Sequence, residues 1–164
     1  MSLTKQIAKQ FTDVYFGGNW TAVNLKDTVL ELTWQDATTK VYTFNTIVAL
    51  VYHMNYYVDL VLKVMKGLPL DGHDKFSFNH PAVESQQQWD SLLEKVWADA
   101  NEFSKLVEEL PEEKLWQNLA AEKYGNYYRN ITGIIEHNHY HLGQIILIKK
   151  LVRQKHEIGA TNED

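Results

Sequence analysis

A chain of 164 residues, 45% hydrophobic and 23% charged, is long enough to bury one continuous core and has the composition of an ordinary globular protein. It has no cysteine, which excludes disulfides, thiolate nucleophiles and thiolate metal sites, so a tight metal site must use histidine or carboxylate ligands. The net charge of -5, without a run of basic residues, disfavours binding to a nucleic acid backbone.

The amino-acid sequence also shows no pattern typical of a targeting signal. No stretch reaches about 18 uncharged apolar residues, and the first five residues lack the apolar segment of a signal peptide. We therefore expect no membrane partner and a cytoplasmic location, with which the lack of cysteine is compatible. No repeat or break in composition divides the chain, so residues 1–164 are predicted to form a single domain.

The first predicted helix covers residues 3–16, where apolar residues recur at steps of three and four, and Gly17 and Gly18 end it. Residues 19–39 follow no single period. They are expected to form a long connection with one or two helical turns, partly anchored by its tryptophans. The alternating residues 40–44 are too few and too isolated to make a sheet.

A second helix is predicted to start after Thr43 or Asn45, either of which is a plausible N-cap, and to run to about Lys66. Residues 70–81 mix polar residues with two phenylalanines. That segment is too apolar for an idle linker, and we expect it to pack on the helices.

A third helix is predicted over residues 82–109, with an apolar inner face and with Lys95 and Asp99 among its outer positions. A short turn near residues 112–116 follows, and a last helix spans about residues 127–155. Four long helices in one small domain predict an all-α fold, a four-helix bundle whose long connections allow crossovers.

The last predicted helix carries His137, His139 and His141 within five residues. His137 and His141 are four residues apart, which on a helix separates them by about 40° and about 6 Å. That places both on one face, with the spacing of helical two-histidine metal sites. His139 points about 200° away from either, so it is expected to be a bystander, and a third ligand must come from elsewhere.

His53 is the candidate third ligand. It lies on the inner stripe of the second helix with Leu50 and Tyr57, while His137 and His141 lie on the inner stripe of the last. A lone buried histidine is more often a hydrogen-bonded core residue, and two histidines four apart also occur by chance on surfaces. Three unpaired imidazoles meeting in an apolar interior would be costly, however, and one divalent metal would satisfy all of them.

Motifs spread along nearly the whole chain carry a family resemblance: Gly18-Asn19-Trp20, Thr46-Ile47 through His53, Trp89, and residues 133–150 with His137, Tyr140-His141 and Gly143-Gln144-Ile145. With these motifs the chain resembles the DinB-like superfamily, which also includes the bacillithiol S-transferases and mycothiol-dependent maleylpyruvate isomerase. The resemblance implies a monomeric or dimeric four-helix bundle with a long crossover. It also implies a zinc or nickel ion held by His53, His137 and His141.

Three neutral histidines leave a divalent ion its charge and an open position, which is typical of a catalytic site. The first hypothesis is a metal-dependent enzyme, either a hydrolase or a thiol-dependent transferase that acts on a low-molecular-weight thiol or another small molecule. No catalytic residue is assigned, because no carboxylate is fixed near the metal. The rival is a non-catalytic bundle that binds metal or a small ligand and forms a homodimer, since Ile135, Leu142 and Ile146 make the last helix apolar on a further face.

For the supporting residues the sequence leaves two roles open, contact at the site or packing within the fold. Four are candidates for contacts to a ligand, to ordered water or to a neighbouring chain: Tyr57, Glu136, Asn138 and Gln144. Gly143 is expected to allow close helix packing, because glycine is costly inside a helix. The loop around Asp74 is a candidate cover for the site, and the remaining histidines are expected to be solvated: His73, His80 and His156.

Overall fold

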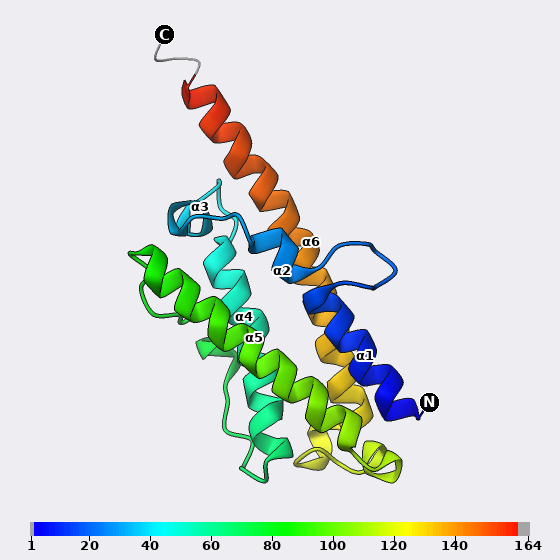
Figure 1. The fold of residues 1–164 in the computed structure, drawn as a ribbon. Coiled ribbons are helices and arrows are strands. Elements are labelled where there is room, and N and C mark those ends of the chain that lie inside the picture. Colours follow the sequence, from blue (N-terminus) through cyan, green and yellow to red (C-terminus); the bar gives the residue numbers. More distant parts are fainter. Residues whose placement is uncertain (1, 161–164) are drawn as a thin grey trace.

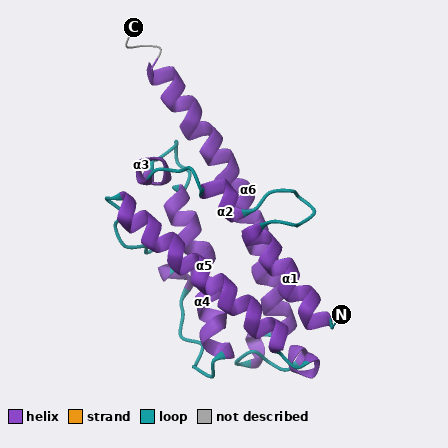
Figure 2. Ribbon diagram, viewed as in Figure 1, coloured by secondary structure: helices purple, strands orange, loops and turns teal. Residues whose placement is uncertain are grey.

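The computed structural model describes residues 2–160, with side chains through residue 158, and within that range the chain forms helices and loops but no β-strand (Figure 2). The prediction of an all-α chain is confirmed. The long helices are α1 (Leu3–Phe16), α4 (Ile47–Met65), α5 (Gln86–Glu109) and α6 (Tyr127–Ala160).

The four long helices surround a common core. α1 packs against α5 and α6, and α4 packs against the same two helices. Figure 1 shows that α1 and α6 run in one direction and that α4 and α5 run in the opposite one. Because α4 and α5 are neighbours that run the same way, residues 66–85 have to return along the bundle before α5 can begin. The helices therefore do not simply alternate up and down, a departure that the long connections had left open.

Short helices occupy the connections: α2 (Leu25–Val29), α3 (Trp34–Thr38), and the 3-10 helices η1 (Asp74–Phe76), η2 (Glu112–Trp116) and η3 (Glu122–Tyr124). The helical turns expected within residues 19–39 and the turn expected at residues 112–116 are confirmed. They cover the ends of the bundle, while α6 continues past the other helices towards the C-terminus (Figure 1).

Two predicted helix starts were wrong, and in both cases the available cap decides the boundary. α4 is capped by Thr46, whose side chain accepts a hydrogen bond from Ala49 N. Before this cap the chain still turns, with a φ of 50° at Tyr42. α5 begins after Ser85, whose hydroxyl accepts from Gln88 N. Residues 82–84 therefore stay outside the helix that was predicted to include them.

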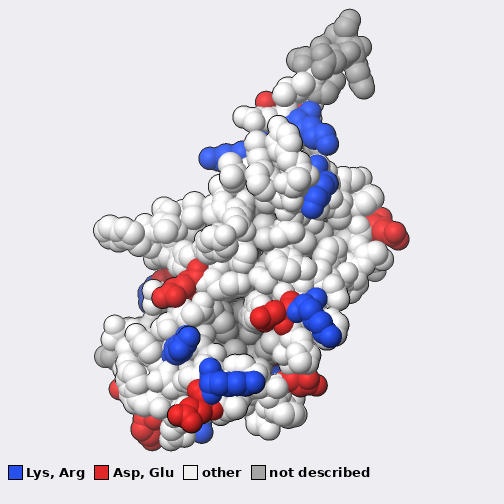
Figure 3. All heavy atoms as spheres, turned by 180° about the vertical axis from the view of Figure 1, so that it is seen from behind, with Lys and Arg blue, Asp and Glu red and all other residues white. Residues whose placement is uncertain are grey.

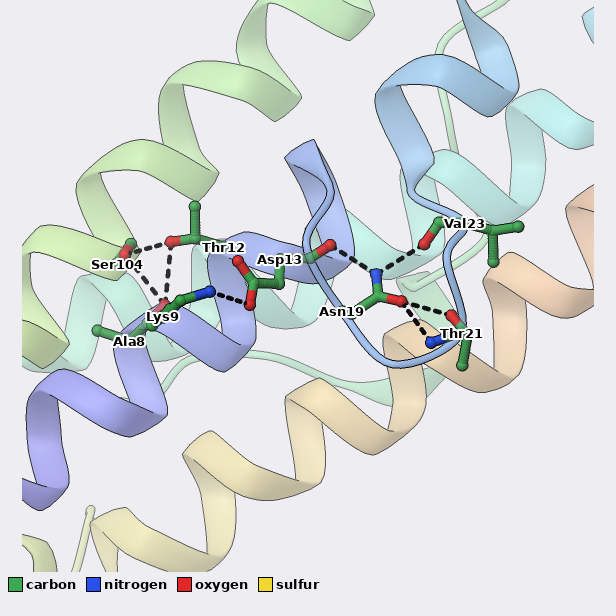
Figure 4. A network of polar contacts seen from close by, with 8 residues as sticks. All are labelled: Ala8, Lys9, Thr12, Asp13, Asn19, Thr21, Val23 and Ser104. Atoms are coloured by element: carbon green, nitrogen blue, oxygen red, sulfur yellow. Dashed lines mark hydrogen bonds and ion pairs between the residues drawn. The ribbon is translucent and has the colours of Figure 1, made fainter.

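A polar loop follows α1, with Gly17 and Gly18 at φ of 102° and 103°, conformations that favour glycine. Asn19 organises this loop: its Nδ2 donates to two backbone carbonyls, and its Oδ1 accepts from the backbone N and the hydroxyl of Thr21 (Figure 4). Trp20 at the tip is fully exposed, so the expectation that it anchors the connection was wrong. Trp34 does pack against the core.

Asp99 was predicted to face outward, but only 9% of it is exposed. Its Oδ2 accepts hydrogen bonds from Asn55 Nδ2 at 2.7 Å and from Lys95 Nζ at 2.6 Å. Asn55 belongs to α4, so this carboxylate ties α5 to α4. Helical periodicity identifies the apolar stripe of α5 but not which border of that stripe meets a neighbouring helix.

α4 is long and apolar enough to cross a bilayer when judged by length and composition alone. In this fold 67% of that stretch is buried inside the bundle. This is the pattern of a central helix that is covered by its own chain.

Candidate metal centre

His53 on α4 and His137 and His141 on α6 converge at the interface between the two helices. His137 Nε2 lies 3.0 Å from His53 Nε2 and 3.0 Å from His141 Nε2. The ligand atoms of all three lie within 4.8 Å of one another, which makes the group one that can hold a metal ion. The three residues that the spacing singled out are thus brought together, 84 positions apart in the case of His53 and His137.

Hydrogen bonds alone do not satisfy these rings. A neutral imidazole nitrogen offers either one N–H or one lone pair, and an amide oxygen only accepts. Gln144 Oε1 lies 2.8 Å from His141 Nδ1, so that nitrogen donates and His141 Nε2 presents a lone pair to the centre. His137 Nε2 then has a single proton or lone pair for two neighbours, and the Nδ1 atoms of His53 and His137 are buried without a hydrogen-bond partner.

A metal ion removes this conflict, because three lone pairs can face one cation at once. Two nitrogen ligands about 2.1 Å from a tetrahedral zinc ion lie about 3.4 Å from each other. The observed 3.0 Å separations are a few tenths of an ångström shorter than that. The ligand atoms of the group as a whole spread up to 4.8 Å, so the donor set fits a divalent ion once the widest separation closes by about 1.4 Å.

Electrostatics favours the protonation state that a metal ligand needs. Burial lowers the pKa of His53 to about 4, and the neighbouring His137 and His141 add to the effect. Burial also lowers the pKa of His137, with a contribution from His141, and that of His141. All three imidazoles are thus neutral near pH 7, with lone pairs available.

The connection between α4 and α5 packs on the helices, as the apolar character of residues 70–81 predicted, and it also covers the site. Phe78 stacks on His53 with ring centroids 3.9 Å apart and planes 8° from parallel. The Tyr56 hydroxyl donates to the carbonyl oxygen of His73 and accepts from its backbone N. These contacts hold the loop over the outer face of His53.

The loop also brings a carboxylate near the histidines, which sequence reasoning missed. The Tyr57 hydroxyl donates to Asp74 Oδ1 at 3.1 Å, and the Tyr57 ring lies edge-on, 5.1 Å from the rings of both His53 and His137. Burial raises the pKa of Tyr57 and the bond to Asp74 adds to it. The sequence marked the loop around Asp74 as a candidate cover but did not assign this carboxylate to the site, because nothing in the pattern placed the loop relative to α4.

Two pockets lie near the centre, but only one of them is lined by a histidine of the group. One, of about 340 Å³, is lined by Tyr57, Arg129, Gly133 and His137 among others. The other, of about 380 Å³, includes Gln144, the residue that holds His141. Both fall at the lower end of the range for small-molecule sites.

The other residues near the pair divide between packing and open roles. Asn138 is fully buried and donates from Nδ2 to the Tyr15 hydroxyl at 2.9 Å, so it ties α6 to α1, the packing role that had stayed open. Glu136 is exposed, and its contact to water or to a neighbouring chain stays a prediction. Gly143 is exposed, and a Cβ placed there would have no heavy atom within 4 Å, so it does not serve close packing.

The remaining histidines lie outside the group. His139 Nδ1 is 3.2 Å from the carbonyl oxygen of Ile135 on its own helix, in keeping with its expected role as a bystander. His80 Nδ1 is 2.8 Å from the Pro81 carbonyl oxygen. The exposed His73 and His156 take no part either.

No family model matches the chain, and no curated protein or solved structure matches it either. The chemistry of the centre has to be inferred from its own atoms. Those atoms form a three-histidine group, His53, His137 and His141, that can hold a metal ion.

Proposed function

We propose that the chain holds a divalent metal ion, zinc or nickel, at His53, His137 and His141 and works as a cytoplasmic metal-dependent enzyme on small molecules. The observation that carries the proposal is the convergence of three Nε2 atoms from two helices. Three neutral ligands leave the charge of the ion uncompensated and leave coordination positions open, as in catalytic rather than structural sites.

The bound ion would supply Lewis acidity, which lowers the pKa of a water or thiol and polarises a carbonyl. The protein supplies the rest. Gln144 Oε1 holds His141 Nδ1–H and so keeps the Nε2 lone pair of that ring directed at the centre. Phe78 excludes water from one face of His53, and the Tyr57 hydroxyl and Asp74 carboxylate hold a proton between them beside the site.

Two reaction classes fit this arrangement, a thiol-dependent transferase and a hydrolase. The pocket beside His137 gives a small molecule access to the centre and does not choose between the two classes. The chain has no cysteine of its own, so the thiol would be a low-molecular-weight cosubstrate. A hydrolase would need a water molecule instead.

Membership of the DinB-like superfamily is part of the same proposal. It is supported by the long crossover between α4 and α5, by the pair of histidines four residues apart on α6, and by a histidine from the second long helix. A fold of this kind hosts different reactions, so the resemblance does not name the substrate.

The first test is metal content. Purified protein is expected to contain close to one zinc or nickel ion per chain by inductively coupled plasma mass spectrometry, and His53→Ala, His137→Ala and His141→Ala to contain almost none. His139→Ala is the matched control, since His139 lies between two ligands on the same helix but bonds to its own backbone. Equal metal content in all four variants would exclude the triad.

The second test is turnover. The metal-loaded protein is incubated with small thiols and electrophiles, and separately with ester and amide panels, and each reaction is repeated after metal removal. Metal-dependent turnover that is lost in His137→Ala is expected. Metal binding without turnover on any panel would favour the rival, a bundle that binds metal or a small ligand without catalysis.

The rival includes a homodimer, and one surface favours it. Large apolar side chains are exposed on α6 and on the connection before α4: Tyr42, Phe44, Tyr140 and Leu147. A dimer was first inferred from three other residues of α6. Of these, Ile135 and Leu142 are buried within the chain itself, and Ile146 is partly buried against the core. Light scattering coupled to size-exclusion chromatography decides the point, and a monomer at all concentrations would remove the dimer.

Binding to nucleic acid is not proposed. On the face seen in Figure 3, basic and acidic side chains are intermixed and form no continuous basic area. Phosphate backbones are bound mainly by such areas.

A further inference from the structure

We propose that the pocket between α4 and α6 binds the anionic end of the substrate, a carboxylate or a group of similar charge, and that Arg129 is the residue that receives it. The inference rests on the proposed metal-dependent function. Arg129 and His137 both line this pocket of about 340 Å³. One cavity therefore joins the metal-binding group to a guanidinium.

Arg129 has an unbalanced charge. It is exposed, and among the described residues it has no acidic partner, whereas the other arginine, Arg153, pairs with Glu31 at 3.1 Å. Arg129 also lies in the first turn of α6, where the helix dipole disfavours a cation and favours an anion. The fold gains nothing evident from a positive charge at this position, but a bound anion would be attracted by the guanidinium and by the helix end together.

The stem of Arg129 passes close to the backbone of Gly125. That glycine has a φ of 78°, and a Cβ there would come within 2.9 Å of Arg129 Cδ. A larger residue at position 125 would therefore displace the arginine stem.

The positions between the two ends define the shape of the ligand. Arg129, Gly133 and His137 are four residues apart in turn, so they follow one face of α6, and eight residues of helix rise about 12 Å. A Cβ at Gly133 would have no heavy atom within 4 Å, so open space lies above it. The substrate class that fits is an extended molecule with a reactive thiol or carbonyl at one end and an anionic group on the order of 10 Å away.

Calorimetry on the zinc-loaded protein tests this with straight-chain ω-mercaptoalkanoates and the ω-mercaptoalkanamides of equal length. For chains long enough to span the pocket, the acid is expected to bind roughly 10- to 100-fold more tightly than the amide. Arg129→Gln should remove that preference, and Arg129→Lys should keep part of it. Gly133→Leu should weaken binding of the long probes without changing the zinc content, and Gly143→Leu is the control, because Gly143 also faces open space but does not line the pocket.

The outcomes separate this inference from the proposed function. Equal affinity of acid and amide in wild-type protein, with zinc bound and thiol binding intact, would overturn the anion site and leave the metal centre standing. Binding of none of the probes would overturn the anion site as well. If ω-hydroxyalkanoates bind as well as the thiols while the dependence on Arg129 persists, thiol binding at the metal fails and the anion site is supported.

Discussion

The buried imidazoles make the stability of the metal-free protein depend on pH in a predictable direction. His53 has a pKa of about 4 in the fold against 6.5 for an ordinary histidine. Between these values the unfolded chain takes up a proton that the folded chain does not bind. The stability of the fold that depends on a neutral His53 is therefore fully present above about pH 6.5 and is lost as the pH falls towards 4.

The magnitude follows from the shift. One pKa unit corresponds to about 1.36 kcal/mol, and integrating the difference for His53 down to pH 5 gives about 2 kcal/mol. A pocket borders the neighbouring His137 ring and His53 is 7% exposed, so water screens part of this effect, and we take about 1 kcal/mol as the expected loss. For a chain of this size that corresponds to about 2–4 °C in the melting temperature.

Urea denaturation at pH 8 and at pH 5, with a chelator present throughout, measures the loss. His53→Gln is expected to lose about 1 kcal/mol less than wild type over this interval, and His73→Gln, in the exposed loop, is the control. The reasoning is refuted if wild type and His53→Gln lose the same stability. With zinc bound the wild-type dependence should be steeper, because protons and metal compete for the same nitrogens.

Three further outcomes test individual contacts. Gln144→Leu removes the acceptor for His141 Nδ1 and should lower metal affinity about 10- to 100-fold in a chelator competition assay; unchanged affinity would show that the ring is oriented otherwise. Asp99→Ala leaves Asn55 and Lys95 without their shared acceptor and should cost about 1–3 kcal/mol in urea denaturation, while a loss below about 0.5 kcal/mol would mean that the buried carboxylate is dispensable. Gly143→Ala should raise the free energy of unfolding by about 0.5–1 kcal/mol, and a decrease would reveal a contact at that position.

Some residues of the candidate site could be identified from local sequence pattern, and others only from the tertiary structure. His137 and His141 were recognisable because four residues is a fixed relation on any helix. His53 was found because the inner stripes of two helices must both face the core, although that rule does not say at which height the helices meet. The loop around Asp74 was only a candidate cover, and the contact of its carboxylate with Tyr57 could not be predicted, since the loop is positioned by Tyr56, Tyr57 and Phe78.

Some errors share a cause: the periodicity of one helix carries no information about which other helices pack against it. Asp99 was read as an outward residue and the role of Asn138 was left open, yet each is buried against a partner helix. Ile135 and Leu142 were read as a face for a second chain and are covered by the first. In each case periodicity located the residue on its helix, and the packing of another helix set its role.

By itself, the sequence determined the all-α class, α1 to the residue, the start of α6 and a pair of histidines on one face of α6, because those depend on relations within a few turns of chain. Only the tertiary structure decided that α4 and α5 run the same way, that a loop covers His53, and that Arg129 shares a pocket with His137. These depend on which surfaces meet, and contacts between distant segments are set by the packing of the whole chain.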